Sequence, residues 1–363
     1  MRPRLLHIID SLSVGGAELL LLNTLTLLPD YEHTVVYLQK PETLKDRIEA
    51  TGARVLCINH SRWKDLPNSV RRLKEIVHQE KPWLIHSHLF YATLLARLAI
   101  PVSLPLVTTL HSSFGKDVFE KNRLSVWAER LTLKKRHHLI GVSEFVLKDY
   151  LRWVPFKGRK HVLYNFLPEN AFVTPQRIEI STVCRCVAVG NLKEAKNYHY
   201  LLQVWEHLRE NNIELHIYGK GHLEGDLEKI IKERRLNVKL CGQVVNINEL
   251  LPGYHLFIQA SEHEGFGLSV IEAMAAGVPV VLSDIPVFRE ITGGNAHFFT
   301  LSGSNKVATK LLELCQNMEN RISHVQQAYR YCRENYASLV YAEKLVSIYQ
   351  SAIGKRNLVH QDF

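Results

Sequence analysis

The segment that decides the fold spans residues 261–284 and reads S-E-H-E-G-F-G-L-S-V-I-E-A-M-A-A-G-V-P-V-V-L-S-D. It follows the apolar run L-F-I-Q-A, and its Gly-Phe-Gly turn leads into a helical pattern. A strand that ends in a glycine-rich loop before a helix leaves backbone N–H groups free to bind an anion. We expect the amides of Gly267, Leu268 and Ser269 to bind a diphosphate. The loop also places Glu264 within reach of sugar hydroxyls, and Glu272, about one turn into the helix, could accept from a ribose.

Strand and helix patterns alternate from this segment in both directions along the chain. Near-continuous apolar strands between helices indicate parallel sheets that are covered on both faces. The alternation occurs twice, on either side of a stretch without periodicity at Asn165–Ser181. We therefore predict an α/β protein with two doubly wound, Rossmann-like domains that face each other across a cleft. Their predicted bounds are residues 1–166 and 182–337.

The predicted strands share short apolar runs bounded by turn residues. They are Leu5–Ile9, Thr34–Leu38, Arg54–Asn59, Leu84–His88, Leu106–Leu110, His138–Val142, Val162–Tyr164, Cys186–Gly190, Glu214–Tyr218, Val238–Cys241, Leu256–Ala260, Pro279–Ser283 and His297–Phe299. The chain beyond Phe299 is mostly helical and ends in a helical stretch at Arg330–Ile353.

Composition favours a soluble cytoplasmic protein with two domains of ordinary size. A chain of 363 residues with 46% hydrophobic residues can build two cores. Its six cysteines include no CxxC pair, so we predict reduced thiols rather than disulfides or a zinc site. The N-terminal apolar run is interrupted by His7 and ends at Asp10, which favours a first strand over a signal peptide. The apolar stretch Ala17–Leu28 is too polar and too short to span a bilayer.

The net charge of +9 is concentrated in residues 130–138 and 152–161. Such a basic surface could be a solvated face, or could attract anionic lipid headgroups or nucleic-acid phosphates. The sequence shows no signature of a nucleic-acid-binding fold. We therefore expect no nucleic-acid partner, and a protein that is cytoplasmic and peripheral on the inner face of the plasma membrane.

Two further glycine-containing loops follow predicted strands. The first, D-S-L-S-V-G-G-A-E at residues 10–18, places Gly15 and Gly16 at the start of a helix, where they fit either a phosphate approach or a tight turn. It matches neither GxGxxG nor a Walker loop. The second, V-A-V-G-N-L-K-E-A-K-N at residues 187–197, places Lys193 and Lys196 after a strand, where lysines suit phosphate as point charges.

Histidines form the remaining candidate group. His111 directly follows a predicted strand, where a neutral imidazole could bind a substrate hydroxyl or be satisfied by the backbone. His86 and His88 alternate along the neighbouring strand, and we expect at most one of them to face the core. No acidic or cysteine partner has zinc-site spacing, and no D-x-D motif is present. We therefore predict a site without a metal.

The segment from Ser261 to Val281 resembles the signature of the retaining GT-B glycosyltransferases of family 4 (group 1), in which two glutamates are separated by seven residues. The resemblance covers nearly the whole chain, through G-G-A-E, L-I-H-S-H, T-L-H, I-G-V-S and V-L-Y-N in the expected order. It implies two facing Rossmann-like domains, an acceptor-side domain and a donor-binding domain. It also implies that a C-terminal helix, residues 338–355, packs back on the first domain.

The resemblance implies a role for each motif residue in binding a nucleotide-sugar donor. Catalytic roles fall to His111 by the sugar, Glu264 at the donor sugar and Lys196 at the diphosphate. The implied donor-binding set is Gly15, Gly16, Gly190, Asn191, Lys193, Lys196, Glu264, Phe266, Gly267, Leu268, Ser269 and Glu272. Asn191 stands where the family usually has arginine, so one cation of the phosphate clamp is missing unless Lys193 replaces it.

We therefore expect a retaining glycosyltransferase that needs no cofactor or metal and uses a nucleotide-diphosphate sugar, with UDP as the nucleotide. The expected acceptor is a glycan or lipid-linked hydroxyl in cell-surface polysaccharide or lipopolysaccharide synthesis. The attack from the same face would retain the anomeric configuration, with the proton passing to the departing phosphate. The alternatives are another GT-B enzyme, such as a phosphorylase or a sugar-nucleotide epimerase, and a basic nucleic-acid-binding or scaffold protein.

Overall fold

The computed structural model describes residues 2–60, 65–120, 122–175, 183–244 and 246–354. The chain divides into two compact units, with boundaries after Asn165 and before Ser338. The first unit combines the residues up to Asn165 with those from Ser338 onward, and the second comprises Phe166–Ala337. Part of the predicted seam, residues 176–181, lies outside the described residues.

The first unit is built on a seven-stranded parallel sheet with the order β3-β2-β1-β4-β5-β6-β7. Its strands are β1 (Arg4–Ile9), β2 (Glu32–Tyr37), β3 (Arg54–Cys57), β4 (Leu84–His88), β5 (Leu106–Leu110), β6 (His138–Gly141) and β7 (Arg159–Val162). Its helices are α1 (Gly16–Leu27), α2 (Lys45–Glu49), α3 (Leu66–Glu80), α4 (Phe90–Ala99), α5 (Arg123–Thr132), α6 (Glu144–Trp153) and α14 (Ser338–Ile353), with one π-helical turn at Gly115–Phe119.

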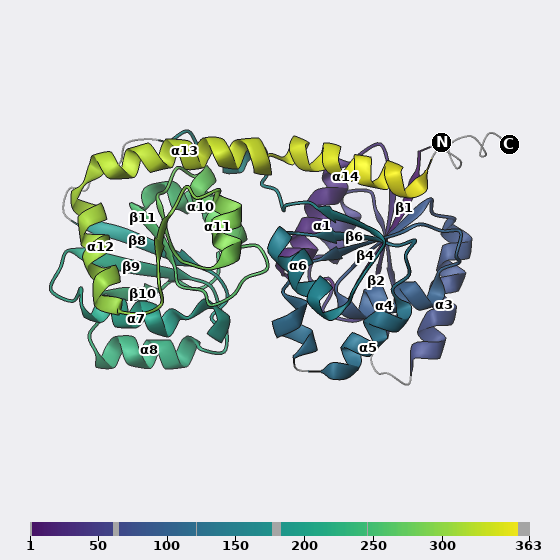
Figure 1. Cartoon of the computed structure of the whole chain (residues 1–363), viewed down its shortest axis with the longest axis horizontal. Helices are drawn as coiled ribbons and strands as arrows, with labels where there is room; N and C mark the ends of the chain where they lie inside the picture. Colours follow the sequence, from purple (N-terminus) through teal and green to yellow (C-terminus); the bar gives the residue numbers. More distant parts are fainter. Residues whose placement is uncertain (1, 61–64, 121, 176–182, 245, 355–363) are drawn as a thin grey trace. The chain divides into compact units, whose positions relative to one another are not determined.

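Alternation along the strands produces two core layers in the first unit. Leu6 and Ile8 pack with α3 and α4 on one face, whereas Ile9 and Val35 pack with α1 on the other. Helices therefore cover both faces of the sheet (Figure 1). Helix α14 adds to the α1 side, where Tyr341 receives a hydrogen bond from Thr24 of α1 at 3.3 Å.

The second unit repeats this design with a six-stranded parallel sheet in the order β10-β9-β8-β11-β12-β13. Its strands are β8 (Cys184–Val189), β9 (Ile213–Tyr218), β10 (Val238–Leu240), β11 (Leu256–Gln259), β12 (Val280–Ser283) and β13 (His297–Phe299). Its helices are α7 (Tyr198–Glu206), α8 (Glu224–Glu233), α9 (Ile247–Leu250), α10 (Leu268–Ala275), α11 (Pro286–Thr292), α12 (Ser304–Gln316) and α13 (Met318–Tyr336), with single turns at Glu169–Ala171, Glu194–Lys196 and Leu251–Gly253.

Both sheets have the strand order of doubly wound folds, so the predicted α/β class is confirmed. Most predicted strands overlap the observed ones, but Val162–Tyr164 is largely wrong, because β7 covers Arg159–Val162. This strand lies at the sheet edge and begins with exposed basic residues. Charged edge strands are common because they block pairing with a further strand. Since they lack an apolar run, the criterion used to predict the other strands does not detect them.

The predicted helical stretch Arg330–Ile353 is two helices. Helix α13 ends at Tyr336 and α14 begins at Ser338. Between them, Ala337 forms a parallel bridge with Leu167. The interruption coincides with this contact, which is distant in sequence and leaves no local signal. Of the helices that the structure describes, none is both long enough and apolar enough to cross a bilayer.

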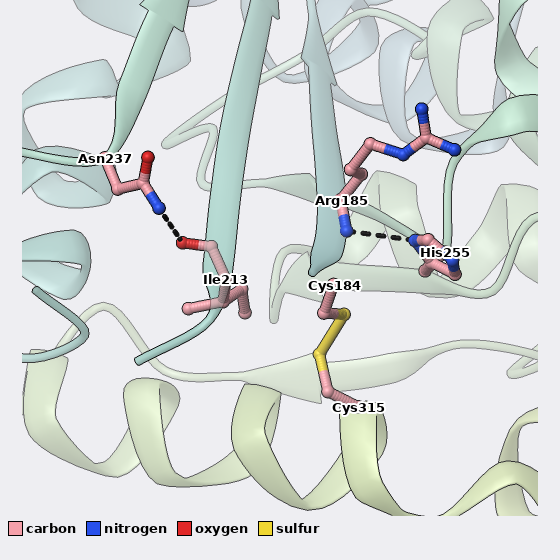
Figure 2. Close-up of a disulfide and its surroundings, with 6 residues drawn as sticks. All are labelled: Cys184, Arg185, Ile213, Asn237, His255 and Cys315. Carbon is pink, nitrogen blue, oxygen red and sulfur yellow. Dashed lines mark hydrogen bonds between the residues drawn. A yellow bond between two sulfur atoms is a disulfide. The ribbon is translucent and has the colours of Figure 1, made fainter. Parts of the chain in front are cut away.

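The prediction of six reduced cysteines is wrong in the structure, where Cys184 and Cys315 form a disulfide (Figure 2). The bond joins the first residue of β8 to α12 across 131 positions of sequence, with the two Cα atoms 6.1 Å apart. The other four cysteines are free. Helix α12 packs on the sheet of the second unit and brings the pair together, which the spacing of cysteines in the sequence does not reveal.

Candidate functional site

The candidate donor site lies at the carboxyl ends of β8 and β11 in the second unit. The two strands are neighbours, and the chain order reverses between them because β8 also pairs with β9. Ligands of doubly wound sheets bind outside the strand ends at such a reversal point. The loops that follow the two strands carry Lys196 and Glu264, and the fold brings these residues together from segments 68 positions apart.

Lys196 and Glu264 form an ion pair with an Nζ–Oε1 distance of 2.5 Å, and both side chains are almost buried. The same Oε1 atom also accepts from Gln259 Nε2 at 2.8 Å and from Ser261 Oγ at 2.8 Å. Three donors on one oxygen fix the carboxylate, because charge-assisted bonds are short and strong. The arrangement places a fixed positive and a fixed negative group side by side, which suits a ligand that carries phosphate and sugar hydroxyls.

Gly190 makes room for Lys196. Its φ angle of +154° lies in a region that L side chains rarely adopt, and an added Cβ would come within 2.8 Å of Lys196 Cε. The carbonyl oxygen of Gly190 accepts from Tyr198 at 2.8 Å. By contrast, Asn191 and Lys193 are exposed. The structure thus pairs Lys196 with Glu264 and leaves Lys193 at the surface of this loop.

Helix α10 begins at the end of the loop after β11. Gly267 is its N-cap residue with a φ angle of +101°, and no side chain caps the helix. The Ser269 hydroxyl donates to Gln259 Oε1 at 3.1 Å, and the buried Phe266 ring packs edge-on against Tyr336 at 5.7 Å. Since the Ser269 side chain points into the unit, the backbone N–H groups of Leu268 and Ser269 at the start of α10 are the groups that could bind an anion.

Glu272 lies on the second turn of α10 and is partly exposed. Burial raises the pKa of its carboxyl to about 7, and the nearby Lys196 ammonium opposes this shift. A carboxyl that titrates near neutrality can accept or donate hydrogen bonds to a diol, so it suits the predicted ribose contact.

In the first unit, the reversal point lies between β1 and β4. Gly15 and Gly16 start α1 as predicted, but the Glu18 carboxylate folds back against them. A Cβ on Gly15 would come within 2.5 Å of Glu18 Oε2, and Glu18 Oε1 accepts from Ser13 at 2.7 Å. A phosphate that approaches Gly16 would therefore meet a carboxylate beside the helix N-terminus.

Asp10 is a second carboxylate at this edge of the first sheet. It accepts from the backbone N–H of Ala92 in the first turn of α4 at 2.6 Å. Burial raises the pKa of Asp10 to about 6, while the helix amides favour its ionised form. The N-terminus of α4 is thus capped by a residue of the chain itself.

His111 follows β5 and is half-buried. Its Nε2 atom lies 3.0 Å from Nδ1 of His88. Burial lowers the pKa of His111 to about 4, so its imidazole is neutral near pH 7. A neutral ring held by a second histidine fits the predicted role as a hydrogen-bonding group for a hydroxyl.

The expectation that at most one of His86 and His88 faces the core is wrong. Both are buried, with ring centroids 4.2 Å apart. Residues two positions apart on a strand project to the same face, which here is the α14 side. His86 lies between Tyr349 of α14 and Thr109 of β5, with both distances 2.7 Å.

His7 joins these two histidines, and the ligand atoms of the three residues lie within 4.8 Å of one another. His33 Nε2 must donate to the Leu28 carbonyl at 3.0 Å, so His33 Nδ1 is an acceptor for His7 Nε2 at 3.2 Å. His7 Nδ1 is then a bare, buried lone pair, and no partner is found for it among the described residues. Neutral imidazoles of this kind are the groups in this part of the chain that could hold a transition-metal ion.

Sequence reasoning missed four residues that shape these sites: Gln259, Ser261, Glu18 and Asp10. Gln259 and Ser261 are polar positions at the end of an otherwise apolar strand and face the same side. Two polar residues at alternate positions after an apolar run were the sequence signal that could have identified Gln259 and Ser261. Glu18 and Asp10 flank the Gly15–Gly16 turn, but their contacts depend on how the side chains fold back.

The chain is similar to known proteins in both sequence and fold. Residues 183–330 match the family model "Glycosyl transferases group 1", and residues 14–170 match "Glycosyltransferase Family 4". The putative glycosyltransferase EpsF of Bacillus subtilis (strain 168) is 26% identical, over 78% of this chain and 79% of that protein. The O-antigen biosynthesis glycosyltransferase WclY of Escherichia coli is 20% identical, over 96% of this chain and 98% of that protein.

Solved structures share the fold. The crystal structure of Anabaena HepE in complex with UDP and glucose superposes with a TM-score of 0.81 at 18% identity, covering 96% of this chain and all of that one. TarM superposes with a TM-score of 0.78 at 14% identity, covering 96% and 99%. Two family models match the chain, and both of its sheets are doubly wound, as in these structures. The chain therefore belongs to the group 1 glycosyltransferases of the GT-B fold.

Proposed function

We propose that this glycosyltransferase transfers a sugar from a UDP-sugar, with retention of anomeric configuration and without a metal ion. The observation that carries the proposal is the ion pair between Lys196 and Glu264, held at the reversal point of the second sheet. A diphosphate beside this pair would gain the Lys196 ammonium and the amides at the N-terminus of α10 as donors. UDP is chosen because the HepE structures contain UDP.

In the proposed reaction, the bond between the sugar and the β-phosphate breaks, and the diphosphate leaves with its charge stabilised by Lys196 and the amides of α10. Preorganised donors are most effective where charge develops in the transition state. Glu264 contacts the sugar with the oxygen that the three donors leave open, and Glu272 binds the ribose. The role proposed for His111 rests on its neutral imidazole alone, which can form a hydrogen bond with a substrate hydroxyl.

Retention follows if the acceptor hydroxyl attacks from the face that the diphosphate leaves. Its proton passes to the departing phosphate oxygen, so no protein base is needed. A double displacement through Glu264 is disfavoured, because three donors on Oε1 stabilise the charge of the carboxylate and make it a weaker nucleophile. The proposed acceptor is a glycan or lipid-linked hydroxyl in cell-surface polysaccharide synthesis, as suggested by the O-antigen relative, and the proposed location is the cytoplasm.

Calorimetry with UDP, GDP and ADP in the presence of EDTA tests the donor site. We expect UDP to bind, and Lys196→Ala to weaken UDP binding at least about ten-fold, as the loss of a charge-assisted hydrogen bond implies. Lys239→Ala is the matched control, because Lys239 is an exposed lysine of the same unit that contacts Glu214. We expect this control to bind UDP like the wild type.

The stereochemistry is tested by proton NMR of the product, which should keep the configuration of the donor sugar. The proposal fails if UDP binding needs a divalent cation, or if Lys196→Ala and Lys239→Ala bind UDP equally well. A covalent sugar on Glu264, detected by intact mass spectrometry, would overturn the proposed single-step route.

A further inference from the structure

Helix α5 of the first unit presents three large apolar side chains to solvent. Leu124, Trp127 and Leu131 are 76%, 65% and 64% exposed. Because they are three and four positions apart, they form one continuous stripe, here called the α5 stripe. Single exposed apolar residues are ordinary, but a contiguous group of them marks an interaction surface.

The opposite face of α5 fixes the stripe in this orientation. Glu129 is buried and forms an ion pair with Arg97 of α4. The same carboxylate oxygen accepts from the hydroxyl of Tyr150 on α6 at 2.5 Å. A buried charge pair with this added donor is costly to break, so α5 cannot rotate to bury its apolar stripe. Figure 1 shows α5 on the side of the sheet that α3 and α4 cover.

Cations flank the α5 stripe without exposed acidic neighbours along the same segment. Arg123 and Arg130 lie on the helix, and residues 134–136 are Lys-Lys-Arg. The one acidic residue between 122 and 136 is the buried Glu129. Arg136 also donates to the carbonyl of Val102 at 3.1 Å, which places another apolar side chain, 78% exposed, beside this basic segment.

We propose that the α5 stripe and its basic flank dock the enzyme on a bilayer that contains anionic lipids. Leucine and tryptophan on one face of a helix, with lysine and arginine alongside, form the amphipathic pattern of helices that lie in the membrane interface. The cations add attraction to anionic headgroups within a Debye length. The inference names a partner for the first unit and does not depend on the identity of the donor nucleotide.

Charge and shape favour a bilayer over other occupants. A second copy that met the stripe through the same surface would bring two basic flanks together, and like charges oppose such a contact. A nucleic acid would use the cations but has no use for Leu124 and Leu131, because its bases stack on aromatic rings. An anionic bilayer satisfies both the apolar and the charged parts.

Co-sedimentation of the full chain with vesicles tests this inference. We expect binding to vesicles of phosphatidylcholine mixed with phosphatidylglycerol, little binding to phosphatidylcholine alone, and weakening as salt rises. Leu124→Ser combined with Leu131→Ser should reduce the affinity about ten-fold or more, since two apolar side chains no longer enter the bilayer. The blue shift of tryptophan emission on binding should disappear in Trp127→Phe.

Leu339→Ser is the matched control, because Leu339 is a leucine of α14 with 69% exposure, and it should bind vesicles like the wild type. UDP binding should be unchanged in all these variants, which separates failure of this inference from failure of the donor proposal. The inference is overturned if the double variant binds like the wild type, or if wild-type binding ignores lipid charge. It is also overturned if the stripe instead mediates dimers, seen by ultracentrifugation as self-association that the double variant loses.

Discussion

At the scale of single residues, Glu264 lies on the loop before α10 and Glu272 lies on α10 itself. The surroundings of the two carboxyl groups have opposite effects on their ionised forms. Glu264 is stabilised by Lys196 and two neutral donors on one oxygen. Among the described residues, no comparable set of hydrogen-bond donors surrounds Glu272, and burial raises the pKa of its carboxyl to about 7. The helix therefore carries a carboxyl that destabilises the fold when it is ionised, which is consistent with a group kept for ligand binding.

This environment predicts a pH-dependent gain of stability in Glu272→Gln. Because the pKa of Glu272 is about 7 in the folded state and near 4.3 when unfolded, wild-type stability falls as pH rises through this window. The glutamine variant does not titrate, so at pH 8 its free energy of unfolding should exceed that of the wild type by about 1–3 kcal/mol. Its affinity for UDP should fall. Urea unfolding at pH 5 and pH 8 measures the effect.

The control for this prediction is Glu262→Gln, because Glu262 is an exposed glutamate on the same loop. A stability difference between Glu272→Gln and wild type that is equal at pH 5 and pH 8 would contradict the prediction.

The sequence identified the charged residues of the donor site but not the network that holds them. Glu264 and Lys196 stand out because glycines and strand ends surround them. Gln259 and Ser261 act through hydrogen bonds whose geometry depends on the neighbouring strand and loop. Lys193 and Lys196 look equivalent in the sequence, and only the folded turn after β8 shows which of them reaches Glu264.

At the scale of strands and helices, the local sequence pattern was sufficient to predict an element wherever burial alone decides its structure. Strands such as Leu84–His88 and Leu106–Leu110 were predicted with their observed bounds. Local pattern failed at the charged edge strand β7 and at Ala337, which bridges to Leu167 between α13 and α14. Both depend on where an element lies in the sheet or unit, which short-range sequence does not encode.

The link between β8 and α12 gives a second prediction. Under denaturing, non-reducing conditions, four of the six cysteines should react as free thiols, because Cys184 and Cys315 are joined. Reduction should lower the free energy of unfolding by about 2–4 kcal/mol, because an open chain gains conformational freedom when unfolded. A thiol titration and urea unfolding with and without reductant provide both measurements.

Cys184→Ser combined with Cys315→Ser should show four thiols and no response to reductant. Cys57→Ser, which removes a free cysteine, should lose one thiol and keep the response. Six reactive thiols in the wild type would show that the pair is reduced in the purified protein.

Across the complete chain, the two units repeat one topology but differ in how they respond to acid. The repetition was predictable, because two runs of alternating strands and helices each specify a parallel sheet. The distribution of buried histidines was not, because it depends on which face of β1 and β4 meets α14. Burial lowers the pKa of eight histidines in the first unit, namely His7, His33, His86, His88, His111, His137, His138 and His161. In the second unit, burial does so for His216 and His297.

This asymmetry predicts that acid destabilises the first unit before the second. Below pH 6.5 the unfolded histidines bind protons, whereas the folded His86 does so only near pH 3 and the folded His111 near pH 4. The stability that these neutral rings provide is therefore complete above pH 6.5 and is lost as pH falls, by up to about 1.4 kcal/mol per pH unit for each histidine. Glu272 in the second unit has the opposite effect, because its contribution to stability decreases as pH rises.

Unfolding followed by calorimetry from pH 7 to pH 5 should show this loss. His86→Gln removes one titrating ring while keeping a polar group between Tyr349 and Thr109, so it should flatten the pH dependence by about 1 kcal/mol per pH unit even if it lowers stability overall. His222→Gln, at an exposed histidine of the second unit that contacts Glu194, serves as the control and should keep the wild-type slope. Equal slopes for wild type and His86→Gln would mean that His86 is not held neutral by burial.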